Sequence, residues 1–475
     1  MVRSLLYLTF LIAFAPIMFA GYDLWDGVII SNAFETENRG IYWNWFTESG
    51  WFLVPLIYDV FYFFIDKDDA LRWMIFFMLV CHLSSAEQLR RIGKRHFDLN
   101  ESAVLTVVAF FLFSPVWAIF TSSVFVMHAL TLFIALYCAC KILDKGYNKS
   151  FLYQLFSLLC FQQASCAVLI LSLLFAEYVY NYKKRKSELY FYVFYVFCSV
   201  SYFFAARYVF PAHGLYDGYN EIKVSNIFQV DGFFIFYQFI NALYPLFIFV
   251  ILWGVAVFPR KGRLLLSLLI FLLVVNIIPF VSVSKLPYAS NIFSYHGWSQ
   301  RQGITLIPLM ALCFGTVIMY AGNKGRVNKI LLYSIVFISL ALSVTSGFKA
   351  LNYKAKSVYL FKGLEYALSS KVKDFSVCDI VIKHDESPIF NNISNYQLAY
   401  VARRVFGSER RIYTRKYDWE NRLMGNSDYR RKYMLPDRPS NCTQYLSVYT
   451  ALPSMGLIDA ALSAPDYSVK VVFSD

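Results

Sequence analysis

The chain has 475 residues, of which 58% are hydrophobic and only 16% are charged. This composition excludes an ordinary water-soluble globular protein, which carries about 25% charged residues. The net charge of +13 does not indicate nucleic-acid binding, because many of the basic residues lie in short segments between apolar runs. A lipid bilayer is the solvent that fits this composition.

Apolar runs recur along the first 346 residues, and each is long enough to cross a hydrocarbon core as a helix. The first run follows Arg3 and no convincing small-residue cleavage site comes after it, so we expect an uncleaved span rather than a signal peptide. The eleven predicted spans are 4–21, 73–90, 102–120, 123–141, 151–163, 165–181, 189–209, 233–258, 264–284, 303–322 and 330–346.

Clusters of basic residues between these runs set the expected orientation. The clusters lie at 90–95, 141–149, 183–186, 260–263 and 324–329. The positive-inside rule places all of them in the cytoplasm. With an odd number of spans, the N-terminus is then cytoplasmic and the C-terminus extracytoplasmic.

Two apolar segments differ from simple spans. Residues 151–181 are too long for one helix and have basic residues at both ends, which predicts a short helical hairpin pinched at Gln162 to Ser165. Residues 51–64 are interrupted by Pro55 and Asp59, which predicts a helix that lies in the outer interface rather than a span.

Residues 347–475 have a mixed, polar composition and are predicted to form a small extracytoplasmic α+β domain. Residues 349–373 have the pattern of an amphipathic helix, and 375–383 and 445–450 have the pattern of strands. The domain contains two cysteines, Cys378 and Cys442, and an oxidising exterior would allow them to form a disulfide.

The first external loop, residues 21–72, contains nine acidic and three basic residues among many aromatic ones. Carboxylates next to a membrane exit suit sugar chemistry, because a base can deprotonate an acceptor hydroxyl while flat rings support a pyranose. A solvated acidic loop with an interfacial aromatic belt is the alternative interpretation. The candidate acids are Asp23, Asp26, Glu35 and Glu37, with Trp25 between the first two.

Polar residues near the ends of later spans are further candidates. Arg301, in a segment that also contains His296, stands where an external loop re-enters the membrane and is placed to hold a lipid phosphate. Arg207 is a second candidate for that role, and snorkelling to the interface is the alternative for both. Gln162 is an amide in an apolar setting, where an interhelical hydrogen bond is the alternative to a substrate contact.

Motifs of other enzyme classes do not occur in the sequence. It has no zinc-spaced Cys/His pattern, phosphate-binding glycine loop, nucleophile elbow or dinucleotide fingerprint, so we assign no metal ligands. The longest predicted internal loop is about ten residues, which leaves no room for a cytosolic domain that binds sugar nucleotides.

The layout of nearly the whole chain resembles the GT-C superfamily of integral membrane glycosyltransferases. It is similar, more narrowly, to the bacterial proteins that glucosylate O-antigen and convert serotype. The resemblance rests on Asp23-Leu-Trp-Asp26 after the first span, on the pinched Phe161-Gln-Gln-Ala164, and on Arg301 leading into Ile304-Thr-Leu-Ile-Pro308.

This resemblance implies an enzyme of the bacterial inner membrane that acts at the periplasmic face. The donor would be a polyprenyl-phosphate sugar such as undecaprenyl-phosphate-glucose, and the acceptor a hydroxyl on a lipid-linked or lipopolysaccharide glycan. Asp26 would be the catalytic base, with Glu35 or Glu37 as competitors. Substrate-binding roles would fall to Asp23, Trp25, Gln162, Arg207, His296 and Arg301. Some relatives bind a divalent cation beside the acid, so a cation remains open here.

Two other functions are compatible with a polytopic chain. An O-antigen or capsule polymerase usually has a large loop between spans rather than a terminal domain. A flippase or transporter of lipid-linked glycans usually has charged residues near the membrane midplane and repeated halves. In this sequence the acids concentrate outside the spans and no repeat is evident, which favours a glycosyltransferase.

Overall fold

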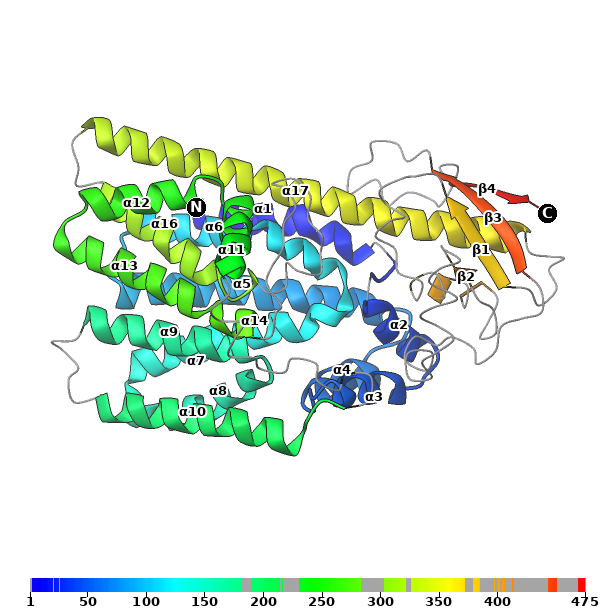
Figure 1. Cartoon of the computed structure of the whole chain (residues 1–475), viewed down its shortest axis with the longest axis horizontal. Helices are drawn as coiled ribbons and strands as arrows, with labels where there is room; N and C mark the ends of the chain where they lie inside the picture. Colours follow the sequence, from blue (N-terminus) through cyan, green and yellow to red (C-terminus); the bar gives the residue numbers. More distant parts are fainter. Residues whose placement is uncertain are drawn as a thin grey trace.

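The structure is a computed structural model of the whole chain (Figure 1). The residues it describes are 2–19, 21–24, 26–181, 189–213, 216, 230–282, 303–321, 326–371, 379–384, 397, 400–401, 404–405, 412–413, 443–450 and 469–474. The α-helices are α1 (Val2–Phe14), α2 (Gly27–Glu35), α3 (Gly40–Glu48), α4 (Val54–Phe64), α5 (Ala70–His96), α6 (Glu101–Leu112), α7 (Val126–Lys145), α8 (Phe151–Ser157), α9 (Ala164–Tyr180), α10 (Leu189–Val209), α11 (Val230–Leu243), α12 (Phe247–Val257), α13 (Arg260–Val275), α14 (Ile278–Ser282), α16 (Ile307–Ala321) and α17 (Arg326–Lys371). Short 3-10 helices are η1 (Ala15–Phe19), η2 (Pro115–Thr121), η3 (Ser123–Phe125), η4 (Tyr147–Lys149) and η5 (Leu158–Gln162).

Several of these helices are long and apolar enough to cross a membrane. Within the described part of the chain four qualify, at 2–19, 70–96, 123–145 and 329–351. Two bent pairs raise the number to six: α6 with η2, at an angle of 44°, and α11 with α12, at 97°. The described part of the chain is therefore mainly helical, with four to six candidate spans, as expected of a membrane protein. All eleven predicted stretches contain helix. Helices α8, α9, α13 and α16 are shorter than a span requires, and α10 provides only a shorter apolar stretch, Val193–Val209.

The predicted pinch in residues 151–181 is present. Helix α8 and the following η5 end at Gln162, Gln163 has extended backbone angles (φ −123°, ψ 92°), and α9 begins at Ala164. The chain therefore does not continue as one helix through this apolar region. The side chain of Gln162 lies outside what the structure describes, so its predicted substrate contact stays a prediction.

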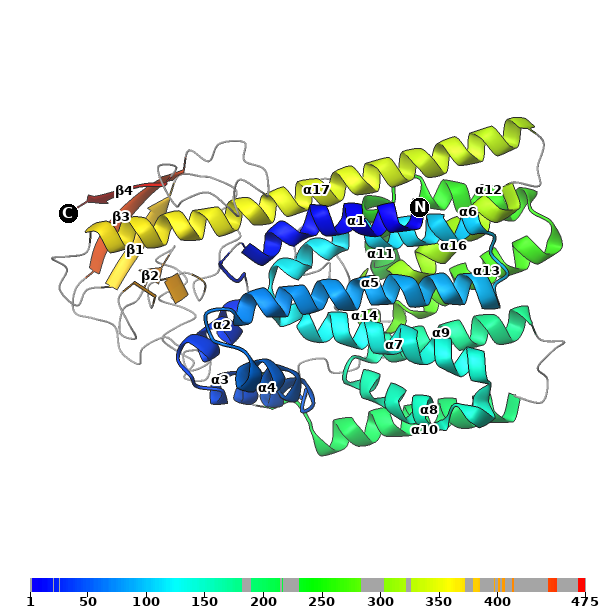
Figure 2. The same cartoon turned by 180° about the vertical axis from the view of Figure 1, so that it is seen from behind.

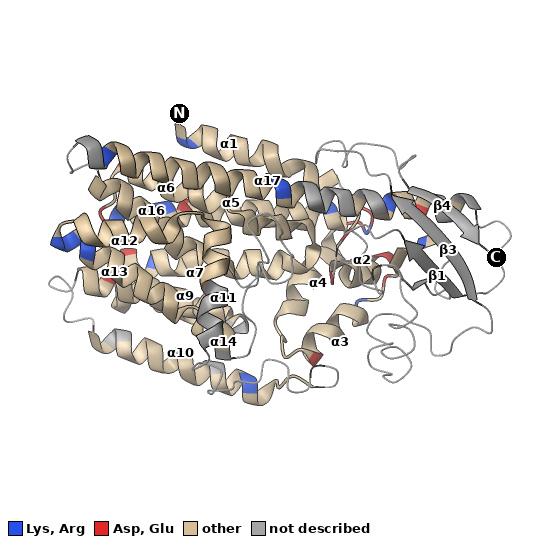
Figure 3. Ribbon diagram, turned by 45° about the horizontal axis from the view of Figure 1, so that its top comes forward, with Lys and Arg blue, Asp and Glu red and all other residues tan. Residues whose placement is uncertain are grey.

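Basic residues gather at one end of the helical bundle, where α13 and α17 begin (Figure 3). Ion pairs join clusters that are far apart in sequence: Arg95 contacts Asp144 at 3.0 Å, and Lys261 contacts Asp98 at 3.1 Å. Three of the predicted basic clusters therefore share one end of the bundle. This is the arrangement that the positive-inside rule requires, and the first loop lies at the opposite end (Figure 1).

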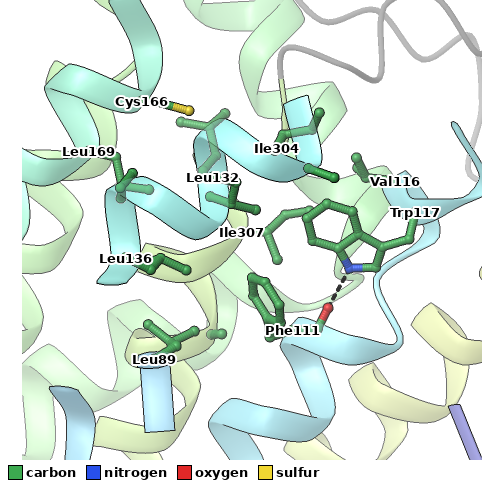
Figure 4. Close-up of a cluster of buried hydrophobic side chains, with 14 of the residues drawn as sticks. Leu89, Phe111, Val116, Trp117, Leu132, Leu136, Cys166, Leu169, Ile304 and Ile307 are labelled. Atoms are coloured by element: carbon green, nitrogen blue, oxygen red, sulfur yellow. Dashed lines mark hydrogen bonds between the residues drawn. The ribbon is translucent and has the colours of Figure 1, made fainter. Parts of the chain in front are cut away.

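The core of the bundle is formed by α5, α6, α7 and α16, with α16 packed along α6. Phe110 and Phe314 stack with ring centroids 3.7 Å apart. Figure 4 shows Trp117 among buried aliphatic side chains, with its indole N–H donating to the carbonyl of Phe111 at 2.5 Å. Gly315 allows α16 to pack closely on α6, since a Cβ at this position would lie 3.0 Å from the carbonyl oxygen of Ala103 in α6.

Replacing Gly315 by valine should separate α16 from α6, because the new side chain meets backbone as well as side-chain atoms. We expect a lower apparent melting temperature in detergent, equivalent to about 1–3 kcal/mol of overpacking. Ala341→Val, at an exposed position of α17, is the matched control. Equal melting temperatures for the two variants would contradict the assigned packing.

The last predicted span and the predicted amphipathic helix 349–373 are one continuous helix, α17, of 46 residues (Figure 2). Gly347 does not interrupt it, which corrects the expectation of two separate helices. A glycine costs a helix interior only about 1 kcal/mol, and Gly347 packs on η2, where a Cβ would lie 3.7 Å from the backbone of Pro115.

A mixed four-stranded sheet lies at the far end of α17, and β4 packs against that helix (Figures 1 and 2). Its strands are β1 (Asp379–His384), β2 (Ile412–Tyr413), β3 (Thr443–Thr450) and β4 (Val469–Ser474). Their order is β2-β1-β3-β4, with β1 parallel to β2 and β3, and β4 antiparallel to β3. The predicted strands correspond to β1 and β3. Cys378 and Cys442 lie outside the described residues, so their disulfide stays a prediction.

Candidate functional site

The first loop is largely helical and leads from η1 to α5 through α2, α3 and α4 (Figure 1). Helix α4 is too short to span a membrane and has two different faces. Tyr58 and Phe61 are buried on one face, whereas Leu56, Val60 and Phe63 on the other face are about half or more exposed. An exposed apolar stripe on an 11-residue helix is typical of an interfacial helix, which supports the predicted position of this segment.

Asp23 anchors this loop to the helical bundle. Its Oδ1 accepts the backbone N–H groups of Leu24 (2.8 Å) and Ser123 (3.0 Å). Its Oδ2 accepts the hydroxyl of Ser31 at 3.0 Å and that of Ser123. Burial raises the pKa of Asp23, and the hydrogen bonds from Ser123 oppose that shift. Because each oxygen already accepts two donors, the geometry favours a structural role over a substrate-binding one.

Gly27 makes the close approach of Asp23 possible. A Cβ at position 27 would overlap the carboxylate of Asp23 and the hydroxyl of Ser122. The first turn of α2 therefore lies directly on the Asp23–Ser123 connection. Asp26 precedes this turn as the N-cap residue of α2, is 7% exposed, and makes no side-chain cap hydrogen bond.

Glu35, at the C-terminal end of α2, is held through one of its two oxygens. Its Oε1 accepts the phenol of Tyr400 at 2.7 Å and Nη1 of Arg404 at 3.2 Å. Among the described residues none donates to Oε2. Glu37, by contrast, forms an exposed ion pair with Lys67 at 2.9 Å. Of these two predicted acids, Glu35 has an oriented carboxylate with one oxygen to which no described residue donates.

Arg404 connects the first loop, α17 and the C-terminal region. Its Nε donates to Oε1 of Glu365 at 3.2 Å, in addition to the Nη1 bond to Glu35. The guanidinium lies over the ring of Tyr22, 4.7 Å from the centroid, and the Tyr22 hydroxyl also donates to Glu365. Burial raises the pKa of Tyr22 and of Tyr400 above their usual value of 10, so both phenols remain hydrogen-bond donors.

A polar cavity of about 180 Å³ lies beside this network. It is walled by η1, α2, the start of α5 and the C-terminal residues Tyr400 and Arg404. Its volume is below the roughly 300–1,000 Å³ typical of pockets for drug-sized ligands, and it suits one sugar ring or a phosphate group. The polar and charged side chains that line it from the first loop and α5 are Ser31, Glu35, Lys67, Asp68 and Arg72.

The other predicted site residues are not brought to this cavity by the described structure. Asp26 does not line it, and Arg207 lies exposed near the end of α10. Trp25, His296 and Arg301 lie outside the described residues. Their predicted roles therefore stay predictions.

Sequence reasoning missed Tyr400, Arg404, Glu365 and Arg72. Nothing near Tyr400 or Arg404 in the sequence marks them, since they reach Glu35 across 365 and 369 positions of the chain. Arg72 was visible as one of three basic residues in an acidic loop, and that was the available signal. Among the described residues, no group of three or more His, Cys, Asp or Glu side chains is arranged to hold a metal ion.

Comparison of the chain with protein-family models and with curated proteins found no match. The functional argument therefore depends on the geometry of the cavity and on the helical architecture around it.

Proposed function

We propose that this protein is a membrane glycosyltransferase that moves a sugar from a polyprenyl-phosphate carrier to a hydroxyl of a cell-surface glycan. The observation that carries the proposal is the oriented carboxylate of Glu35 in a cavity that also contains Lys67, Arg72 and Arg404. One site thus combines a base with cations. A glycosyl transfer with a phosphate leaving group requires both.

Glu35 is the proposed base, in place of the predicted Asp26. Its Oε2 takes the proton of the acceptor hydroxyl, the acceptor oxygen attacks the anomeric carbon, and the bond from that carbon to the phosphate oxygen breaks with inversion. Arg72 and Lys67 stabilise the charge that develops on the departing polyprenyl phosphate. Their existing ion pairs, with Asp69 and Glu37, are exposed and therefore weak enough to be exchanged.

The topology in this proposal is the one predicted from the sequence. Eleven spans place the basic end of the bundle in the cytoplasm, and the first loop and the C-terminal α+β domain at the periplasmic face of a bacterial inner membrane. The exposed apolar face of α4 lies in the outer leaflet, close to where a polyprenyl chain would lie. Glucose and an O-antigen or lipopolysaccharide acceptor are the substrates that the family resemblance implies.

Proteoliposomes test the proposed reaction against transport. Purified protein is reconstituted with undecaprenyl-phosphate-glucose labelled in the sugar, and O-antigen acceptor is supplied. We expect label in the glycan, in an amount that depends on the acceptor. Movement of labelled lipid between leaflets without a glycosidic product would contradict the proposal and indicate a flippase. Joining of acceptor repeats without use of the labelled donor would contradict it and indicate a polymerase.

A further inference from the structure

The C-terminal region contributes side chains to the proposed site. Tyr400 and Arg404 wall the cavity, although every other residue that lines it belongs to the first 74 positions of the chain. Tyr400 is 2% exposed and its hydroxyl points to Glu35. A surface segment that merely rested on the loop would not bury a phenol against a carboxylate, since that burial needs a fixed partner.

Both C-terminal donors converge on the same oxygen. The phenol of Tyr400 and Nη1 of Arg404 bind Oε1 of Glu35, at 2.7 and 3.2 Å. Two donors on one oxygen fix the plane of the carboxylate and leave Oε2 for the acceptor. Arg404 is itself fixed through Nε by Glu365 of α17 and by the ring of Tyr22 beneath it.

We infer that Tyr400 and Arg404 are positioning residues of the transferase site, and that their contacts with the first loop close one side of the cavity. The inference rests on the proposed function for its catalytic part. The closing of the cavity rests on the positions of Tyr400 and Arg404 in its wall, and it can be tested without any substrate. Arginine suits this position because its planar fork can donate to Glu35 and Glu365 together, whereas lysine is a point charge.

The kinetic test compares Tyr400→Phe, Arg404→Lys and Arg404→Ala with Arg39→Ala, an exposed first-loop arginine outside the cavity. We expect kcat per folded protein to fall about tenfold or more in Arg404→Ala. Smaller losses are expected in Arg404→Lys and Tyr400→Phe, with the donor KM nearly unchanged in all three. In a Glu35→Gln background, Arg404→Ala should add no further loss. Values of kcat within twofold of Arg39→Ala, or additive losses in the double variant, would overturn the positioning role.

A labelling test reports closure independently of activity. Leu71, a partly buried residue of the cavity wall, is replaced by cysteine and treated with a membrane-impermeant maleimide, with the unsubstituted protein as background. Adding Arg404→Ala should speed labelling several-fold, and adding Arg39→Ala should not. Equal rates would overturn the closure. If the wild-type protein transfers no sugar, the proposed function fails, and the labelling rates alone then decide whether Arg404 closes this cavity.

Discussion

Glu35→Gln is expected to reduce sugar transfer by about 10²- to 10⁴-fold, the usual contribution of a general base. Glutamine keeps the shape of the side chain and still accepts from Tyr400 and Arg404 through its amide oxygen, so the local structure should persist. It replaces Oε2 with an NH₂ group, which cannot take a proton from the acceptor. Steady-state kinetics of purified protein, normalised to the folded fraction, measure the loss.

Glu37→Gln and Asp26→Asn are the comparison variants for Glu35→Gln. Glu37 is two positions away, carries the same charge and does not line the cavity. Its ion pair with the cavity residue Lys67 is exposed and therefore weak, so its variant should retain most of the activity. Asp26 was the acid favoured by the sequence, but it does not line the cavity. Full activity in Glu35→Gln together with complete loss in Asp26→Asn would identify Asp26 as the catalytic base. That result would contradict the proposed role of Glu35.

Asp23→Ala is expected to be the most destabilising change in the first loop. It removes the acceptor of four hydrogen bonds and leaves the buried N–H of Ser123 without this partner. An unsatisfied buried group costs about 1–3 kcal/mol, and the loss of a charged acceptor adds to that. The apparent melting temperature in detergent should fall by several degrees, and transfer should fall because α2 and Glu35 lose their anchor.

Asp66→Ala provides the comparison for the Asp23 variant, because Asp66 is an exposed acid of the same loop outside the cavity lining. Its melting temperature should match that of the unsubstituted protein. If Asp23→Ala is equally stable but inactive, the carboxylate of Asp23 acts in catalysis or substrate binding, and the structural role inferred from its four donors is wrong.

Much of the helical architecture could be predicted because local sequence determines it. Apolar length and flanking charges locate helices such as α5 and α7, and the two glutamines at 162–163 mark the break before α9. The continuity of α17 through Gly347 was missed, because a change in composition was interpreted as a change in structure. The order of the four strands was also beyond prediction, since each pairing joins segments that are distant along the chain.

The acids of the site could be predicted, but the distinction between them could not. Asp23, Asp26, Glu35 and Glu37 have similar surroundings in sequence, among aromatic residues just after the first span. Their roles are separated by partners elsewhere in the chain: Ser123 supplies two of the four donors to Asp23, whereas Arg404 binds one oxygen of Glu35. Spacing within the loop contains no information about those partners.

The most direct test of the central claim is mass spectrometry of the acceptor after incubation of purified protein with a set of undecaprenyl-phosphate sugars and O-antigen glycan. The proposed mechanism predicts a mass gain of one sugar with the wild-type protein and with Glu37→Gln, and no gain with Glu35→Gln. A gain that persists in Glu35→Gln would contradict the role of Glu35, and no gain with any donor would contradict the glycosyltransferase itself.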